Sequence, residues 1–368
     1  MGTEQVKEGM MRLWKETFGD SDKYISLLFE RYFDPGLIAY HEENDEIKSA
    51  LLGVPYDFKS HDGKTLRGLY LCGLATKKDI RHRGLMSGLL EEINVKSEEK
   101  GFDFTFLIPV DEGMRRYYRD RVYHDSFYVK KDYYVRGHNF KSEEMLSLSE
   151  YGSQEASELL EFLKTYGNKS YEKGNSYYLI HSIKDWETVL EESLISDEPV
   201  IIGKINDTIH AIAFCKESEK TIEVKKLITD EAKYQDALLS AIMKSKPESN
   251  LIVVRDLEDI IEKNSGVQLW SPFYAQSNGK DAEYEDIAVM EQPFNETLNS
   301  YSFGMIRIFD IKDILHKTGF SDLEALEAYS EKELLQIVLR KPQGKKGDAL
   351  EKILDLPEIN FSISLMLE

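Results

Sequence analysis

Apolar residues spaced three and four positions apart predict two helices at the start of the chain. The first stripe runs from Met10 to Phe18, and the second runs from Ile25 to Phe33. Between them, the sequence Gly-Asp-Ser-Asp at 19–22 supplies a helix stop followed by capping side chains. We therefore expect two short helices joined by a tight turn.

Beyond these helices the pattern changes to strands, then returns once to the helical period. Strands are expected over 37–41, 47–59 and 66–75, with a hairpin turn at Asp62-Gly63. Residues 84–99 carry apolar side chains on one helical face, and Gly101 ends that helix. A buried strand at 102–108, a short helix at 111–121 and a strand-like segment at 127–135 complete this part.

The second half of the chain repeats the same order of elements. A hairpin at 200–215 with the turn Asn206-Asp207 is followed by a strand, a helix and a strand, at 221–228, 230–244 and 251–254. The polar stretch 136–152 loses periodicity and is predicted to be a linker. We expect three units, at residues 1–138, 153–295 and 299–368, the last with a strand at 304–309 and helices near 311–317 and 323–340.

Composition narrows the class of protein. The chain has 368 residues, 41% of them apolar, and only two cysteines, Cys72 and Cys215, which excludes a disulfide scaffold. No apolar run is long enough to span a membrane, so a cytoplasmic protein is expected. The net charge of −20 argues against nucleic acid and anionic membranes as partners, and a cationic or amine substrate would suit it.

One basic loop stands out against this acidic background. Lys77, Lys78, Arg81 and Arg83 lie between a predicted strand and a helix that begins at Gly84. The first N–H groups of a helix lack partners and bind anions, and a glycine allows a ligand close to the backbone. Basic side chains oppose the helix dipole at this end, which favours a bound anion over a solvated loop.

The residues of this loop resemble a known family. Arg81-His82-Arg83-Gly84-Leu85-Met86 is similar to the Arg/Gln-x-x-Gly-x-Gly/Ala loop of the GNAT superfamily of N-acetyltransferases, although Met86 replaces the small last residue. With the repeated unit, the chain resembles the enhanced intracellular survival (Eis) type. That resemblance implies an α+β fold of tandem GNAT-like mixed sheets flanked by helices, plus a small α/β C-terminal piece similar to sterol-carrier domains.

The resemblance also implies a cosubstrate and its contacts. Acetyl-CoA would place its pyrophosphate on the loop and its pantetheine arm along the preceding strand, which includes Leu74, Ala75 and Thr76. The strand at 102–108 would splay away and open the acceptor cleft. In the second unit the corresponding stretch has no glycine and carries Asp230 and Glu231, so one CoA per chain is expected.

Two further residues are implied as acid and base. Tyr118-x-x-x-Val122-Tyr123 resembles the Tyr-x-x-x-Gly-Phe/Tyr motif, whose first tyrosine is the general acid, with Val122 in place of glycine. Tyr117 is the alternative acid, and packing is the alternative role for both. The arginines around them could lower the phenol pKa. In Eis-type proteins the terminal carboxylate serves as base, which makes Glu368 the candidate here, unless this end only completes a core.

The expected function is transfer of an acetyl group from acetyl-CoA to a primary amine in a ternary complex, with a small-molecule or peptide acceptor. No metal site is expected from the scattered histidines, and a homo-oligomer is left open. Two alternatives remain: a Fem-type aminoacyl transferase, against which the acidic charge argues, and a non-catalytic acyl-CoA- or lipid-binding module.

Overall fold

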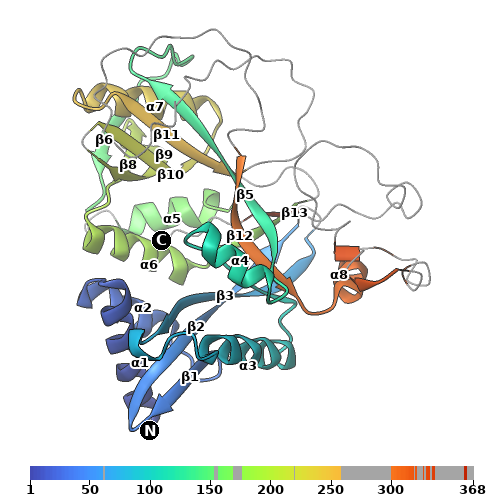
Figure 1. Cartoon of the computed structure of the whole chain (residues 1–368). Helices are drawn as coiled ribbons and strands as arrows, with labels where there is room; N and C mark the ends of the chain where they lie inside the picture. The colour runs from blue at the N-terminus through green and yellow to red at the C-terminus, as the bar shows by residue number, and fades with distance from the viewer. Residues whose placement is uncertain are drawn as a thin grey trace.

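The fold is described here from a computed structural model of the chain. The structure describes residues 1–60, 63–152, 156–168, 176–218, 220–257, 300–318, 320, 326, 329–331, 334–335 and 360–362. Within these ranges the chain is a mixed α+β structure in which strands form one hydrogen-bonded sheet and helices cover both of its faces (Figure 1).

The N-terminal helices start where the sequence supplies caps. Helix α1 spans Thr3–Phe18 and ends at Gly19, whose φ of 81° is the left-handed conformation that glycine adopts readily. Helix α2 spans Asp22–Tyr32, and the Ser21 hydroxyl accepts a hydrogen bond from the N–H of Tyr24. Both predicted helices are confirmed, and α1 begins seven residues before the predicted apolar stripe.

The first part of the sheet is built mainly from strands that follow these helices. Its strands are β1 (Ile38–Glu43), β2 (Glu46–Lys59), β3 (Thr65–Thr76) and β4 (Phe104–Leu107). β1 and β3 are antiparallel to β2, whereas β3 and β4 are parallel, because helix α3 (Leu85–Glu99) carries the chain back between them. Helix α4 (Glu112–Arg119) then leads into β5 (His124–Val135).

Strands from distant parts of the sequence complete this sheet. The order is β13-β7-β2-β3-β4-β12-β5-β11-β10-β9-β8-β6, with β1 beside β2. Strand β12 (Ser300–Ile308) lies between β4 and β5, and β7 (Ser176–Ile180) extends the outer edge of β2. The long β5 pairs with β12 near its start and with β11 (Leu251–Leu257) toward its end, so it runs through both parts of the sheet (Figure 1).

The second part of the sheet has the predicted order of hairpin, strand, helix and strand. Its elements are β8 (Val200–Ile205), β9 (Thr208–Glu217), β10 (Thr221–Thr229), α7 (Lys233–Ser245) and β11. Asn206 and Asp207 both have positive φ in the two-residue β8–β9 turn, which confirms the predicted hairpin. Helices α5 (Ala156–Tyr166) and α6 (Ile183–Ser196) precede it.

One predicted linker is wrong. Within 136–152, strand β6 (Ser147–Glu150) pairs antiparallel with β8 at the far edge of the sheet. An edge strand has only one bonded neighbour and both its faces are partly exposed, so its sequence lacks the alternation that marks a half-buried strand.

The helices are divided between the two faces of the sheet. Residues of α1, α2 and α8 (Ile311–Lys317) share one apolar core on one face of the first part, and those of α3 and α4 share another core on the opposite face. In the second part, α5 and α6 cover one face and α7 covers the other. The remaining described strand, β13 (Asn360–Ser362), is parallel to β7.

Candidate functional site

Strands β3 and β4 separate at the point where the sequence predicts a cleft. Their parallel pairing covers three residue pairs and ends at Tyr70 opposite Phe106. Beyond it, β3 continues to Thr76 beside β2, while β4 ends at Leu107 and is held by β12 on its other edge. The edge of β3 over residues 71–76 therefore has no strand beside it among the described residues, and its backbone groups can pair with an extended ligand.

A bulge in β3 shapes this free edge. Between the pairs Ala50–Ala75 and Leu52–Cys72 the register shifts, and Gly73 has a φ of 61°. A Cβ at Gly73 would lie 2.1 Å from the Trp14 ring, so only glycine fits under that indole. The bulge turns Leu74 toward the core beneath α3 and Ala75 toward the core of α1 and α2, with the Ala75 carbonyl bonded to the Ser49 hydroxyl.

The loop after β3 presents unpartnered N–H groups. A short 3-10 turn at Lys78–Ile80 is anchored by buried Ile80, and the chain then reaches α3 through His82 and Gly84, whose φ values are 64° and 81°. Within the described part of the chain, no acceptor is bonded to the backbone N–H groups of residues 82–87. A Cβ placed on Gly84 would meet no atom within 4 Å, so a ligand has room to approach it.

The four basic residues of this loop differ in their availability. Lys77 pairs with Glu16 and Glu46, and the ammonium groups of Lys48 and Lys77 lower the pKa of Glu46 to about 2. The Lys77 ammonium group is therefore neutralised by two carboxylates, whereas the sequence predicts that it contributes positive charge to a phosphate site.

The Arg81 side chain turns back, and its Nε donates to the Thr76 carbonyl at 2.9 Å, which fixes the loop to the end of β3. Lys78 and Arg83 are exposed and form no ion pair with any described residue. Their charges are not paired within the described part of the chain. Leu85 and Met86 begin α3, and Met86 packs against the core that α3 shares with α4.

The structure explains the tyrosine motif at the end of α4 as a helix-ending turn. The N–H of Tyr123 donates to the Tyr118 carbonyl, and the N–H of Val122 donates to the Arg119 carbonyl, both at 3.2 Å. This pair of bonds is a Schellman motif, in which the residue at the position of Val122 must be left-handed. Val122 accordingly has a φ of 64°, and the rings of Tyr118 and Tyr123 pack edge to face at 5.8 Å.

Tyr118 is buried on the face of the sheet that α3 covers. It is 5% exposed, lies in the core with Leu71 and Leu107, and its hydroxyl forms no hydrogen bond with a described residue. Burial, followed by the neighbouring Tyr123 and Tyr117, raises the pKa of Tyr118 well above its usual value. The phenol therefore stays neutral and keeps its proton at pH 7.

This direction corrects the expectation that nearby arginines lower the pKa of Tyr118. Arg115 and Arg119 are paired with Glu112 and Asp125, so their charges are largely neutralised. Arg121 does lower the pKa of Tyr118, but its effect is the smallest and burial outweighs it.

Tyr117, the alternative acid, has a different environment. Its hydroxyl lies 3.1 Å from Ser87 Oγ in the first turn of α3, and the Arg121 guanidinium stacks 3.5 Å from the centre of its ring. The contact between Ser87 and Arg121 could not be predicted from the sequence, because the two residues lie 34 positions apart. Glu368, the candidate base, lies outside the described residues.

The turn before α7 differs from the one before α3, although the strands are arranged alike. Strands β10 and β11 also separate after a few parallel pairs, and β10 has a bulge at Lys225. Before α7, however, the Asp230 carboxylate lies 2.8 Å from His210 Nδ1, and the N-cap residue is Ala232 rather than a glycine. A carboxylate at this turn repels phosphate, and a single CoA site per chain stays a prediction.

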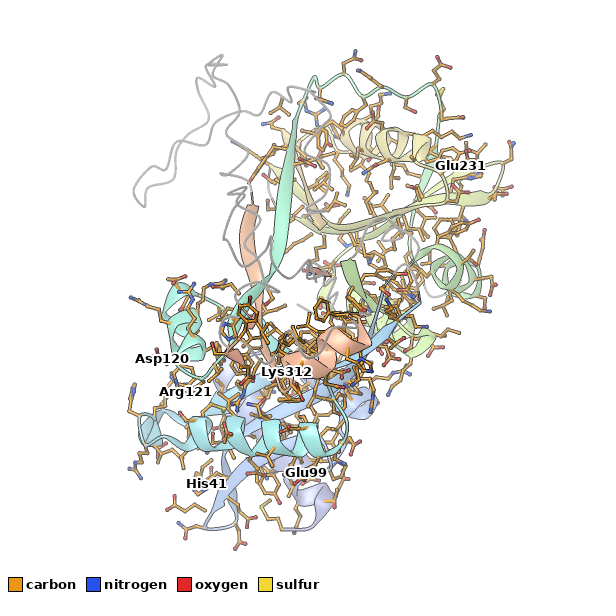
Figure 2. The ribbon with its side chains drawn as sticks, turned by 90° about the vertical axis from the view of Figure 1, so that its right-hand side faces the viewer. His41, Glu99, Asp120, Arg121, Glu231 and Lys312 are labelled. Atoms are coloured by element: carbon orange, nitrogen blue, oxygen red, sulfur yellow. The ribbon has the colours of Figure 1, made fainter. Side chains whose placement is uncertain are left out.

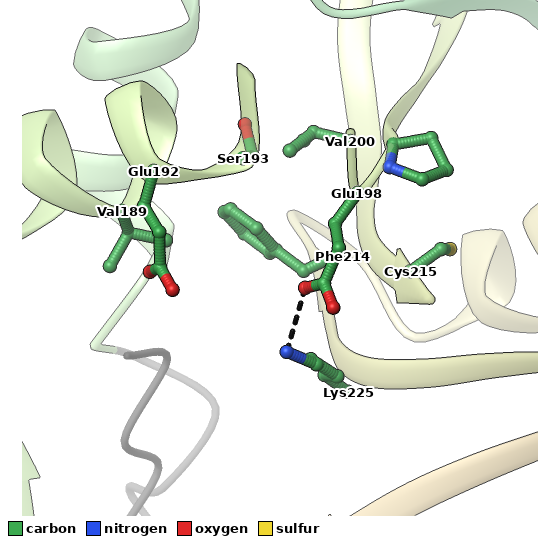
Figure 3. Close-up of a pocket in the computed structure, with 9 residues that line it drawn as sticks. Val189, Glu192, Ser193, Glu198, Val200, Phe214, Cys215 and Lys225 are labelled. Carbon is green, nitrogen blue, oxygen red and sulfur yellow. Dashed lines mark hydrogen bonds and ion pairs between the residues drawn. The ribbon is translucent and has the colours of Figure 1, made fainter. Parts of the chain in front are cut away.

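Two hollows are formed by described residues elsewhere. The first has a cavity volume of about 20 Å³, room for about one water, and is lined by residues of α6 and β8–β10, among them Glu198 paired with Lys225 (Figure 3). The second, of about 440 Å³, is a surface groove between α2 and α6. Neither borders residues 71–87, so the candidate site rests on the separated strands and the start of α3.

The described residues contain neither a candidate metal site nor a helix that could cross a membrane. No group of three or more His, Cys, Asp and Glu side chains is placed to hold a metal ion. No described helix has both the length and the apolar content needed to cross a membrane.

Comparison with known proteins agrees with this geometry. Residues 2–123 match the family model described as acetyltransferase (GNAT) domain, whereas no curated protein matches the chain. A GCN5-related N-acetyltransferase from Kribbella flavida shares the fold with a TM-score of 0.59 at 15% identity, over 87% of this chain and 73% of that one. Eis1 from Mycobacterium abscessus does so with a TM-score of 0.56 at 10% identity, over 88% and 76%. Residues 2–123 thus match a GNAT acetyltransferase domain, a type of domain that supports transfer of an acyl group to an amine in general.

Proposed function

We propose that the protein transfers an acetyl group from acetyl-CoA to a primary amine by direct attack in a ternary complex. The observation that carries this proposal is the start of α3. There, among the described residues, N–H groups without acceptors, an open glycine and two basic side chains without ion pairs follow the unpaired edge of β3. This arrangement fits a diphosphate joined to an extended arm.

The chain's own groups would divide the binding as follows. The N–H groups of residues 82–87 and the charges of Lys78 and Arg83 hold the pyrophosphate, and the edge of β3 over Leu74–Thr76 pairs with the pantetheine arm. The amine would approach the thioester where β3 and β4 cease to pair. We also propose that the chain has an Eis-like arrangement of units and that its acyl donor is acetyl-CoA.

Tyr118 would act as the general acid. Transfer forms a C–N bond and breaks a C–S bond, so one proton must leave the amine and one must reach the departing thiolate. A buried phenol that stays neutral holds the second proton ready, and the turn at Val122 fixes its backbone. The α-carboxylate of Glu368 is the proposed acceptor of the first proton, directly or through water.

Calorimetric titration with CoA and acetyl-CoA tests the binding step. Wild-type protein should bind both ligands, and Gly84→Val should lose binding because its side chain would occupy the space over the N–H groups. Gly19→Val is the matched control, since Gly19 has the same φ of 81° and equally open surroundings but lies at the end of α1. Absence of heat from folded wild-type protein would overturn the proposal.

Release of free thiol from acetyl-CoA in the presence of a panel of amines tests the chemistry. Amine-dependent release that falls at least 100-fold in Tyr118→Phe, with unchanged CoA affinity, is expected from loss of a general acid. Binding without turnover would instead support a non-catalytic acyl-CoA module.

A further inference from the structure

Arg121 joins the segment that carries Tyr118 to the first turn of α3. Its Nε and Nη2 donate to Ser87 Oγ at 3.1 and 2.7 Å, and its Nη1 donates to the Tyr117 carbonyl at 2.6 Å. Its guanidinium also stacks on the Tyr117 ring. Figure 2 places Arg121 at the end of α3 opposite to Glu99, which is the end where the free N–H groups lie.

The chemistry of Ser87 makes this a directed network. Two N–H groups of Arg121 occupy the acceptor positions of the Ser87 hydroxyl, which leaves its O–H to donate to the Tyr117 oxygen 3.1 Å away. Serine 87 is the third residue of α3, so the network is attached to the same helical turn that presents its N–H groups to the phosphate.

The charge of Arg121 is not balanced by a carboxylate. Arg115 and Arg119, its neighbours on α4, each pair with Glu112 and Asp125. Arg121 has no acidic partner in the part of the chain that the structure describes. A lone cation at a helix N-terminus is unfavourable because it opposes the helix dipole, and an anion bound at that turn would offset this repulsion.

Arg121 also belongs to the turn that orients Tyr118. Its backbone N–H donates to the Tyr118 carbonyl at 2.8 Å, one residue before Val122 completes the Schellman motif. The same residue therefore contacts the phosphate-binding turn with its side chain and the tyrosine with its backbone.

From these contacts we infer that Arg121 is a positioning residue that couples binding at the start of α3 to the order of the Tyr118 segment. An anion at this turn strengthens the hold of Arg121 on Ser87, which restrains α4 and with it the Tyr118 phenol. The inference rests on the proposed function, because CoA supplies the anion.

Hydrogen exchange of peptides covering residues 112–123, measured with and without CoA, separates coupling from a purely structural role. In wild-type protein, CoA should slow exchange in this segment. In Arg121→Lys and in Ser87→Ala, CoA should still bind within about threefold of the wild-type affinity, yet the slowing should be lost. The double variant should behave like either single variant, because each substitution breaks the same contact between Arg121 and Ser87.

Arg116→Lys is the matched control. Arg116 lies on the same helix, is exposed, and its side chain forms no hydrogen bond or ion pair with a described group, so this variant should respond to CoA like wild type. With an amine acceptor, Arg121→Lys should lower kcat about tenfold and leave KM for acetyl-CoA nearly unchanged.

Equal slowing by CoA in wild type and both variants would overturn the coupling, as would the same loss in Arg116→Lys. Faster exchange in the variants by the same factor with and without CoA would show a structural clamp only, and would also overturn it. If wild-type protein gives no heat with CoA, the proposed function itself fails, and calorimetry distinguishes that result from failure of the coupling alone.

Discussion

Replacing Val122 with glycine should stabilise the protein. Val122 is held at a φ of 64° by the two hydrogen bonds that end α4, and its side chain is 56% exposed. A β-branched residue in the left-handed region is an outlier, because its Cβ crowds the following carbonyl. The family's motif has glycine at this place, and the Schellman geometry supplies the physical reason.

The magnitude follows from three terms. Relief of the left-handed conformation contributes about 1–2 kcal/mol, and the greater freedom of glycine in the unfolded chain offsets about 0.5–1 kcal/mol of it. Loss of side-chain burial is small because more than half of Val122 is exposed. The net gain should be about 1 kcal/mol, which raises Tm by a few degrees in a protein of this size.

Helix α3 supplies an internal reference for this change. It ends in the same pair of bonds, from Phe102 N–H to the Ser97 carbonyl and from Gly101 N–H to the Glu98 carbonyl, with Gly101 at a φ of 74°. A Cβ there would meet only Arg67 Nη1, at 3.7 Å, so Gly101→Val tests the backbone term almost alone.

Thermal and urea unfolding of both variants should give shifts of opposite sign. Val122→Gly should raise stability and Gly101→Val should lower it by a similar or larger amount. If Val122→Gly destabilises the protein while Gly101→Val behaves as expected, the left-handed strain at Val122 is refuted.

Three further predictions concern the site and its supports. Because burial raises the pKa of Tyr118 above the usual value of about 10, kcat should not fall through loss of this proton below about pH 10, and a pH–rate profile of wild type against Tyr118→Phe would show an earlier fall if the reasoning is wrong. Gly73→Ala should destabilise the protein by more than about 2 kcal/mol in urea unfolding, since its Cβ would overlap the Trp14 ring and its φ is positive; a loss below 1 kcal/mol would show that the indole moves freely. Burial lowers the pKa of His124 despite Asp125 and Glu331, so stability should fall as pH drops below about 6.5, where the unfolded chain binds the proton more readily. His124→Gln should lessen that fall between about pH 7.5 and 5.5, and an unchanged pH dependence would contradict the assignment.

The local features of the site could be predicted from the sequence because they depend on neighbouring residues. A glycine between a basic loop and an amphipathic stripe predicts a helix start, and Gly84 with α3 confirms it. The sequence also shows a valine at the glycine position of the tyrosine motif. That Val122 is held in the left-handed region could be established only from its φ in the structure. The ion pair of Lys77 with Glu46 could not be predicted, because Glu46 lies 31 positions away on another strand.

Strand pairing was beyond the sequence for a related reason. The sequence at 304–309 predicts a strand, yet nothing in it indicates the partners of that strand. Pairing of β12 with β4 and β5 joins residues about 200 and 180 positions apart, and only the summed burial of both faces selects that register. The predicted boundaries at 138 and 299 remain a prediction, but β5, β7 and β12 each link the segments that they separate.

This exchange of strands bears directly on the candidate site. Every residue of β4 is buried, so its second edge must be bonded, and β12 supplies those bonds with the fully buried Met305 and Ile306. Arg307 then reaches over to Glu91 and ties β12 to α3. Strand β4, from which β3 separates, and the helix that begins at Gly84 are thus both held in place by a segment about 200 residues downstream. Residues 2–123, which match the acetyltransferase domain, include the proposed ligand-binding groups of β3 and α3, whereas the strand β12 that supports β4 lies outside that range.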